Sequence, residues 1–279
     1  MRTHLQAAVS AVLLPAVALL LAACGQATPE DDPATGSDTE RILETHEFED
    51  AEVTRVHREM VAAMAPDAGW ERTRYLEFDW GVARGAGEPP LVRSHRLDRW
   101  EGRARAEFDS EAGRVVALFD LDEPRAGRVW LDTSEVTGED AVPLLERAHS
   151  AHINDAYWLL MPYKWTDPGV HARYVGQETA EDGRTFDVVE LSFEDDTGLT
   201  PRNMYRAFVN TETGLMERWH FLRDAEANPS PSDWTHWTRV GPIQLALNRE
   251  SGGQTRIFFS HVLAKEEVPE GTLVPPTYP

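Results

Sequence analysis

Three polar residues at regular spacing could bind a cation: His149, His152 and Asp155. On a helix, a step of three residues moves each side chain about 60° from the one before, so the three could still surround a metal ion. Ligands from one helix seldom converge without another from elsewhere in the chain, which favours helix-surface or capping roles for them. We therefore expect no metal and no cofactor, with this trio as the weaker alternative.

A second group of residues combines aromatic rings, a methionine and a lysine close to Pro162: Tyr157, Trp158, Met161, Tyr163, Lys164 and Trp165. The group predicts either a buried plug that closes one end of a barrel or the wall of an apolar ligand pocket. Lys164 could meet a lipid phosphate or carboxylate at the mouth of that pocket, or simply pair with Asp167.

Composition excludes several classes of protein. The 279 residues include 27 Lys and Arg against 48 Asp and Glu, a formal charge of −21. Such an acidic chain is a poor ligand for the phosphate backbone, so we expect no nucleic-acid partner. One cysteine forms no internal disulfide. The motifs G-x-S-x-G, H-E-x-x-H and G-x-x-x-x-G-K-[ST] do not occur, and no catalytic residue is predicted.

The single cysteine ends an apolar N-terminal stretch. Leu5 to Leu21 is rich in Ala, Val and Leu and leads into Leu-Ala-Ala-Cys-Gly at residues 21–25. This segment resembles a bacterial lipoprotein signal, which implies cleavage before Cys24 and acylation of that cysteine; a plain signal peptide with a coincidental cysteine is the alternative. Several acyl chains would anchor the protein without a spanning helix. Because Gly25 is not the Asp that retains enteric lipoproteins at the inner membrane, we expect an outer-membrane location facing the periplasm.

The remainder divides into a tether and a folded body. Residues 24–40 begin with the acylated cysteine and continue with Gly, Pro, Ser, Thr and acidic residues without apolar periodicity, which predicts a flexible tether after a signal peptide at 1–23. Residues 41–275 form the predicted domain. Val53, Val56, Met60 and Met64 predict a helix within Thr39–Met64. A second helical segment is predicted within residues 138–162.

Period-two alternation predicts eleven strands. They lie near residues 76–82, 92–100, 103–110, 113–121, 127–132, 170–178, 185–194, 203–210, 215–223, 236–248 and 256–265. Most neighbouring strands are joined by short turns, which is typical of antiparallel pairing. The predicted fold is mainly β: an antiparallel, open or partly closed barrel with one N-terminal helix and one inserted helical segment as a lid.

Several segments are similar to known families. Residues 154–164, Asn-Asp-Ala-Tyr-Trp-Leu-Leu-Met-Pro-Tyr-Lys, resemble a family of uncharacterised bacterial envelope lipoproteins with the motif N-D-x-Y-W-L-L-M-P-Y-K, as do Gly198-Leu199-Thr200-Pro201 and Thr213-Gly214-Leu215. More remotely, the strand count, the helical insert and the Thr-Gly-Leu hairpin resemble the LolA/LolB lipoprotein-carrier superfamily. That resemblance implies an unclosed barrel, helices as a lid, and the handling of a lipid.

Two classes of function follow from these expectations. The first is an anchored module that binds or transfers a lipid, an acyl chain or another apolar ligand. The second is an envelope enzyme that uses acids or histidines at the barrel rim. A protein-interaction module for assembly or stress sensing is a further alternative. The missing nucleophile motifs favour binding over catalysis.

Overall fold

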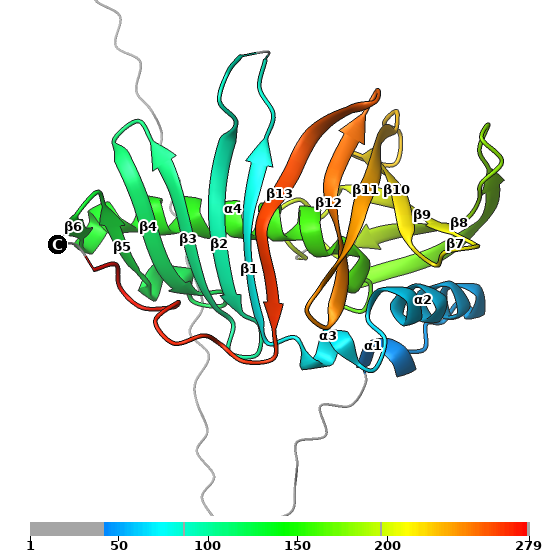
Figure 1. Cartoon of the computed structure of the whole chain (residues 1–279), viewed down its shortest axis with the longest axis horizontal. Helices are drawn as coiled ribbons and strands as arrows, with labels where there is room; N and C mark the ends of the chain where they lie inside the picture. Colours follow the sequence, from blue (N-terminus) through cyan, green and yellow to red (C-terminus); the bar gives the residue numbers. More distant parts are fainter. Residues whose placement is uncertain (1–41, 86, 196, 278–279) are drawn as a thin grey trace, which may run out of the picture. The chain divides into compact units, whose positions relative to one another are not determined.

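Thirteen antiparallel strands form one sheet, built from two consecutive meanders (Figure 1). The computed structural model describes residues 42–85, 87–195 and 197–277, so the predicted signal peptide, tether and Cys24 lie outside the described residues. The first meander consists of β1 (Tyr75–Val82), β2 (Leu91–Asp98), β3 (Arg103–Ser110), β4 (Gly113–Asp120), β5 (Arg128–Leu131) and β6 (Ser134–Val136). The second consists of β7 (Val170–Thr179), β8 (Thr185–Phe193), β9 (Met204–Asn210), β10 (Met216–Leu222), β11 (Ser230–Val240), β12 (Ile243–Ser251) and β13 (Gln254–Lys265).

The two meanders meet where the first strand pairs with the last. Strand β1 pairs antiparallel with β13, with Tyr75 opposite Lys265 and Val82 opposite Ile257. Strands β6 and β7 are the two edges of the sheet, so the sheet is open. This confirms the predicted mainly β, antiparallel and open architecture.

The strand count is thirteen rather than the predicted eleven, for two local reasons. Residues 236–248 were predicted as one strand, but the chain turns at Gly241 and Pro242, so this range belongs to both β11 and β12. Gly241 has φ +54°, a left-handed conformation that suits glycine and permits the turn. Strand β6 has only three residues, Ser-Glu-Val, too few to show an alternating pattern.

A 20-residue helix, α4 (Ala141–Leu160), joins the two meanders and lies behind the sheet in Figure 1. It contacts β3, β4, β5 and β12. We call the sheet face that α4 covers the helix face, and the opposite face the outer face. Beneath the helix, the small side chains of Ala104, Ala106 and Ala117 are fully buried, which allows the helix to approach the sheet closely. The predicted inserted helix is therefore confirmed.

The predicted N-terminal helix is interrupted. It consists of α1 (Ile42–Thr45) and α2 (Ala51–Met64), and α3 (Gly69–Arg72) follows. Asp50 starts α2: its backbone is extended and its side chain accepts a hydrogen bond from the Glu52 amide at 3.0 Å, which is N-capping geometry. Val53, Val56, Met60 and Met64 are fully buried on one side of α2, as their spacing predicted.

Three short 3₁₀ turns complete the elements: η1 (Pro124–Ala126), η2 (Gly138–Asp140) and η3 (Met161–Tyr163). Two of them flank α4 directly. Because η3 continues from the last turn of α4, the proline of the Met-Pro-Tyr segment sits where a regular helix ends.

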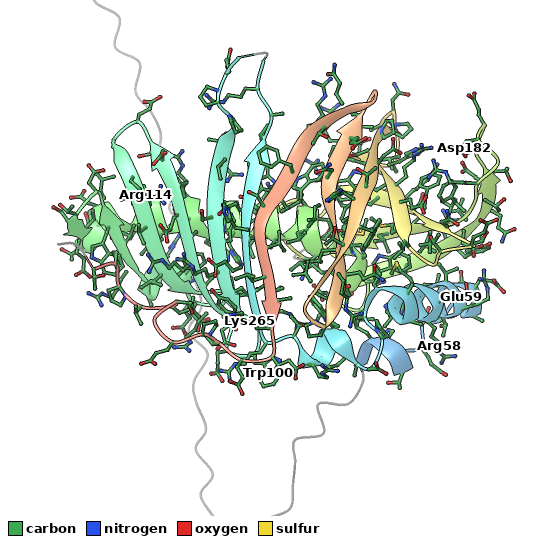
Figure 2. The ribbon with its side chains drawn as sticks, in the orientation of Figure 1. Arg58, Glu59, Trp100, Arg114, Asp182 and Lys265 are labelled. Atoms are coloured by element: carbon green, nitrogen blue, oxygen red, sulfur yellow. The ribbon has the colours of Figure 1, made fainter. Side chains whose placement is uncertain are left out.

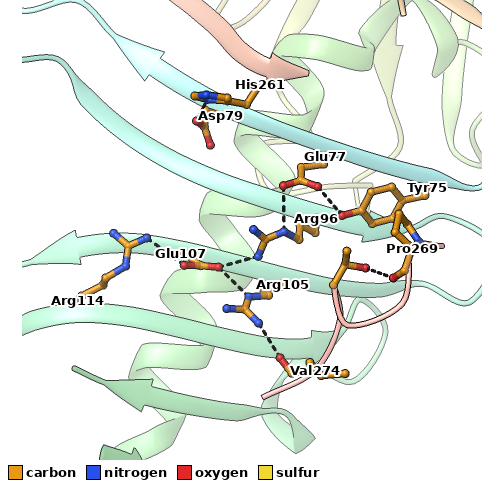
Figure 3. A network of polar contacts seen from close by, with 11 residues as sticks. Tyr75, Glu77, Asp79, Arg96, Arg105, Glu107, Arg114, His261, Pro269 and Val274 are labelled. Atoms are coloured by element: carbon orange, nitrogen blue, oxygen red, sulfur yellow. Dashed lines mark hydrogen bonds and ion pairs between the residues drawn. The ribbon is translucent and has the colours of Figure 1, made fainter. Parts of the chain in front are cut away.

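The outer face of the first meander carries a network of ion pairs (Figure 3). Glu107 on β3 accepts hydrogen bonds from Arg96 at 2.8 Å, Arg105 at 2.8 Å and Arg114 at 3.0 Å. Burial alone would raise the pKa of Glu107, but the three guanidinium groups outweigh it and hold that pKa below its ordinary value. Arg105 also donates to the Val274 carbonyl at 2.6 Å, so the C-terminal segment lies against this charged face. The apolar core is on the other side of the sheet.

Candidate functional site

A buried polar cluster joins α4 to the helix face of the sheet. Its residues are Arg93 and His95 on β2 and His152 and Asp155 on α4. The Asp155 carboxylate is fully buried and accepts two hydrogen bonds of 2.6 Å from the Arg93 guanidinium. Nε2 of His95 lies 2.8 Å from Oδ2 of Asp155, and Nδ1 of His152 lies 3.3 Å from Nδ1 of His95.

Local sequence spacing explains how each element presents its half of this cluster. Arg93 and His95 are two residues apart on β2, so both side chains point to the same face of the sheet. His152 and Asp155 are three apart on α4 and share its buried side. The Arg93 guanidinium also lies 4.1 Å from the centroid of the Trp80 ring, so it is held by a cation–π contact as well as by Asp155.

The electrostatics of the cluster favour a structural ion pair rather than a catalytic base. Burial holds the pKa of His152 well below its ordinary value, which disfavours the charged form of its ring. The Asn154 side chain adds a hydrogen bond of 2.9 Å to Oδ1 of Asp155, so both carboxylate oxygens are engaged. The carboxylate is therefore occupied by donors from its own chain.

His149 stands apart from this cluster. Its half-buried ring makes an edge contact with Phe119 at 5.9 Å, and burial lowers its pKa. In the part of the chain that the structure describes, no group of three or more His, Cys, Asp or Glu side chains is arranged to hold a metal ion. The structure thus brings His152 and Asp155 to one buried site but does not assemble them with His149 as ligands.

The C-terminal members of the predicted aromatic group lie in the hydrophobic core. Met161, Tyr163 and Trp165 are each at most 1% exposed. The Tyr163 hydroxyl lies 2.7 Å from the Gln244 carbonyl and 3.2 Å from the Met64 carbonyl, which ties η3 to both β12 and α2. Trp70 stacks on Tyr163 with centroids 4.4 Å apart. These three residues pack as part of the central hydrophobic cluster.

The last turn of α4 contributes the half-buried members of the group. Trp158 lies 4.4 Å from Trp219 on β10, and Tyr157 lies 5.3 Å from Tyr205 on β9. Trp219 in turn contacts Trp234 on β11 at 5.3 Å. We call Tyr157, Trp158, Tyr205, Trp219 and Trp234 the aromatic wall. The strand members were not predicted as site residues.

Lys164 forms an ion pair with Asp167, three residues along the chain. Both side chains are more than a third exposed, so the pair contributes little to stability. A contact between Lys164 and a lipid headgroup remains a prediction.

Arg249 on β12 is a buried cation that the sequence did not reveal. It is 1% exposed, and its guanidinium lies 3.4 Å from the centroid of Trp234 in the aromatic wall. Its Nε donates to the Trp158 carbonyl in the last turn of α4 at 2.9 Å. Burial holds the pKa of Arg249 well below its ordinary value. The signal that could have found it is that Arg249 continues the alternate positions of Ile243, Leu245 and Leu247, but its neighbours Asn248 and Glu250 are polar, as they are around many exposed arginines.

Two pockets on the described surface lie elsewhere. One, of about 480 Å³, is lined by α2 and the residues before it, and its rim includes Arg58 and Glu59, which Figure 2 shows on the outward side of that helix. The other, of about 380 Å³, lies between the outer face and the C-terminal segment. Neither is lined by residues of the aromatic wall. No helix of the described chain is long and apolar enough to cross a bilayer.

Comparison with known proteins finds likeness of fold at low identity. No protein-family model matches the sequence, and no curated protein matches it either. A LolA superfamily protein from Nitrosomonas europaea is 11% identical with a TM-score of 0.44, over 79% of this chain and 96% of that one. A DUF1329 family protein from Desulfovibrio piger is 13% identical with a TM-score of 0.42, over 78% and 97%.

A third solved structure, described as an outer membrane lipoprotein-sorting protein domain from Vibrio parahaemolyticus, is 9% identical with a TM-score of 0.44, over 78% and 94% of the two chains. One of these three structures is described as a LolA superfamily protein, and the likeness to each of them is one of fold alone. The family with the N-D-x-Y-W-L-L-M-P-Y-K motif is not confirmed. At this level of similarity, no ligand or activity follows from these structures.

Proposed function

We propose that this protein is a membrane-anchored bacterial lipoprotein that binds or transfers a lipid, an acyl chain or another apolar ligand in the cell envelope. One observation carries the proposal: α4 covers much of the apolar helix face of an open sheet, on which α2 also packs at β7 and β12, and α4 is joined to the sheet through a buried polar cluster. Displacing α4 would expose the strand members of the aromatic wall, Tyr205, Trp219 and Trp234, as an apolar binding surface.

The polar cluster supports α4 as a lid. The buried side of the helix is apolar except at His152 and Asp155, whose partners are on the sheet. Removing an ion pair from water costs several kcal/mol, so a buried pair often stabilises less than apolar residues of the same size would. A helix held in this way separates from the sheet at a lower cost than one with a continuous apolar stripe.

The ligand would bind the state in which α4 has moved. Aromatic rings and Met side chains of the helix face would then take acyl methylenes out of water, at about 0.8 kcal/mol for each CH₂. Because only the open state binds, the apparent affinity depends on the fraction of molecules in that state. Affinity should rise with chain length until the exposed surface is filled.

Titration of the purified body with fluorescent fatty acids of increasing chain length tests the proposal. The informative variant is Trp219→Asp, which places a charge among the strand members of the aromatic wall and should abolish the binding of long chains more than that of short ones. Trp100→Asp is the matched control, since Trp100 is 54% exposed and lies at the β2–β3 turn (Figure 2).

We expect Trp100→Asp to bind as the unchanged protein does. If no chain length binds while circular dichroism shows an intact fold, the aromatic wall is only a structural plug. Binding that does not depend on chain length would equally contradict an acyl site.

A further inference from the structure

Arg249 is a feature of the helix face that apolar packing does not explain. Buried charges in proteins are normally paired with an opposite charge. Arg93 follows this rule with Asp155, but among the described residues no ion pair joins Arg249 to a carboxylate, and burial alone accounts for its lowered pKa. All of its hydrogen-bond acceptors are neutral main-chain carbonyls.

The hydrogen bonds of the Arg249 guanidinium show which of these carbonyls a ligand could replace. Nη1 donates to the carbonyls of Ala246 at 3.0 Å and Asn248 at 2.9 Å, both on its own strand. Nε and Nη2 both donate to a single oxygen, the Trp158 carbonyl. An arginine side chain has five N–H donors, so these four bonds leave one donor without an acceptor among the described residues.

The Nε–Nη2 edge is the side of an arginine that binds a carboxylate or a phosphate with two parallel hydrogen bonds. In this structure the edge is occupied by one neutral oxygen that belongs to α4, the helix proposed to move. When α4 leaves, the Trp158 carbonyl leaves with it. Arg249 would then remain as an unpaired cation within the aromatic wall, beside Trp234 and 5.2 Å from Phe259.

We infer that the ligand is an anionic amphiphile, and that Arg249 binds its carboxylate or phosphate group while the aromatic wall binds its chain. This inference rests on the proposed function and specifies the class of ligand. An anionic head would accept hydrogen bonds from Nε and Nη2 in place of the Trp158 carbonyl, and it would supply the missing counter-charge. The donor is charged in both states, so the gain comes from the charge of the acceptor and from its second oxygen, which allows two parallel hydrogen bonds in place of two bonds to one oxygen.

The experiment compares ligands of one chain length that differ only in the head. A fatty acid, its methyl ester, an alkyl phosphate and inorganic phosphate are titrated into the purified body at about pH 8, where both acids are ionised. We expect the fatty acid and the alkyl phosphate to bind at least about tenfold more tightly than the methyl ester. The ratio of the two acids distinguishes a carboxylate from a phosphate head, and inorganic phosphate should bind weakly because it lacks a chain.

Variants then assign the preference to one residue. Arg249→Met should make the affinities for the fatty acid and the methyl ester equal while the ester still binds. Arg249→Lys should retain part of the preference, because lysine keeps the charge but lacks the two parallel N–H donors of the guanidinium. Arg99→Met is the matched control. Arg99 also stacks on a tryptophan at 3.4 Å and donates to main-chain carbonyls, but those of Trp70 and Thr73, outside α4.

Each outcome decides the inference. If the unchanged protein binds acid and ester equally, the inference is wrong while the proposed apolar function stands, and this comparison does not depend on whether any variant folds. If Arg249→Met keeps the preference, another group binds the head. If none of the chain-bearing ligands binds, the proposed function fails and the inference fails with it.

Discussion

At the scale of single residues, the helix face contains two kinds of cation, the partly buried Arg93 and the buried Arg249. Arg93 is neutralised by a carboxylate on α4, whereas Arg249 relies on carbonyl groups and an aromatic ring. The first arrangement holds the lid in place, and the second leaves a charge that a ligand can satisfy. The same face therefore contains one arginine that holds α4 in place and one that could bind a ligand, and each can be changed by a separate substitution.

Asp155→Asn should weaken the attachment of α4. The amide cannot neutralise Arg93, so a charge remains without its partner; the free energy of unfolding should fall by about 3 kcal/mol, the lower end for a broken buried pair because Arg93 is 21% exposed. The open state should become more populated, and apolar dyes and acyl chains should bind more tightly. Urea unfolding and dye titration measure the two effects.

Asp167→Asn is the control for that substitution, since it removes the same group from the half-exposed pair with Lys164. It should change the free energy of unfolding by less than about 1 kcal/mol. A loss of stability in Asp155→Asn without tighter binding would mean that the cluster is structural and that α4 is not a lid.

His57 should make stability depend on pH. Its ring is fully buried on α2 without a hydrogen-bond partner in the described structure, and burial lowers its pKa to about 4. The unfolded chain, with a pKa near 6.5, therefore binds a proton first as the pH falls, so stability present above about pH 6.5 is lost towards pH 4. Between pH 7 and pH 5 this residue alone should cost about 2 kcal/mol.

His57→Phe tests that expectation by removing the titrating group while keeping a ring against Phe48 and Trp165. Urea unfolding at pH 7 and pH 5 should show a smaller loss in the variant than in the unchanged protein. His152, His149 and His220, whose pKa values are also lowered, contribute to the pH dependence that remains. Equal losses in both proteins would assign the effect elsewhere.

At the scale of elements, local pattern predicted most of what the structure contains. Alternation identified the strands other than β6, although it merged β11 and β12 into one, and helical spacing identified α4 and the buried stripe of α2. The site was only half predicted, because His152 and Asp155 share one helix whereas their partners Arg93 and His95 are on a strand about sixty residues away. Nothing in local spacing indicates which distant strand a helix will cover.

The turn of the β11–β12 hairpin, which the sequence did not predict, has glycine at position 241, and a substitution there tests why glycine is required. A Cβ at Gly241 would lie 2.1 Å from the Ala264 carbonyl oxygen, and φ is +54°. Gly241→Ala should therefore lower the free energy of unfolding by more than the roughly 1–2 kcal/mol that a left-handed alanine costs by itself. Thermal or urea unfolding gives the value.

Gly252→Ala is the matched control in the next hairpin, since Gly252 has φ +59° and no atom within 4 Å of an added Cβ. It should show the conformational cost alone, about 1 kcal/mol. If the two variants lose equal stability, close approach to Ala264 does not matter and the turn at Gly241 depends only on backbone conformation.

At the scale of the whole molecule, the proposed role depends on where the folded body is held. Cys24→Ala removes the sulfur that acylation requires, so the variant should leave the membrane fraction and appear in the soluble envelope fraction. Fractionation followed by immunoblotting measures the distribution, and Trp100→Asp serves as a variant that keeps the cysteine. An unchanged distribution of Cys24→Ala would contradict the lipoprotein hypothesis.

The pairing of β1 with β13 also constrains how the protein folds during its synthesis. The central seam of the sheet joins its first strand to its last, so neither half can complete its hydrogen bonding during synthesis until Lys265 has been made. Contacts between residues so distant in sequence slow folding. A nascent chain of this topology stays unfinished until its last strand emerges, and a premature stop before β13 would divide the sheet through its middle instead of shortening an edge.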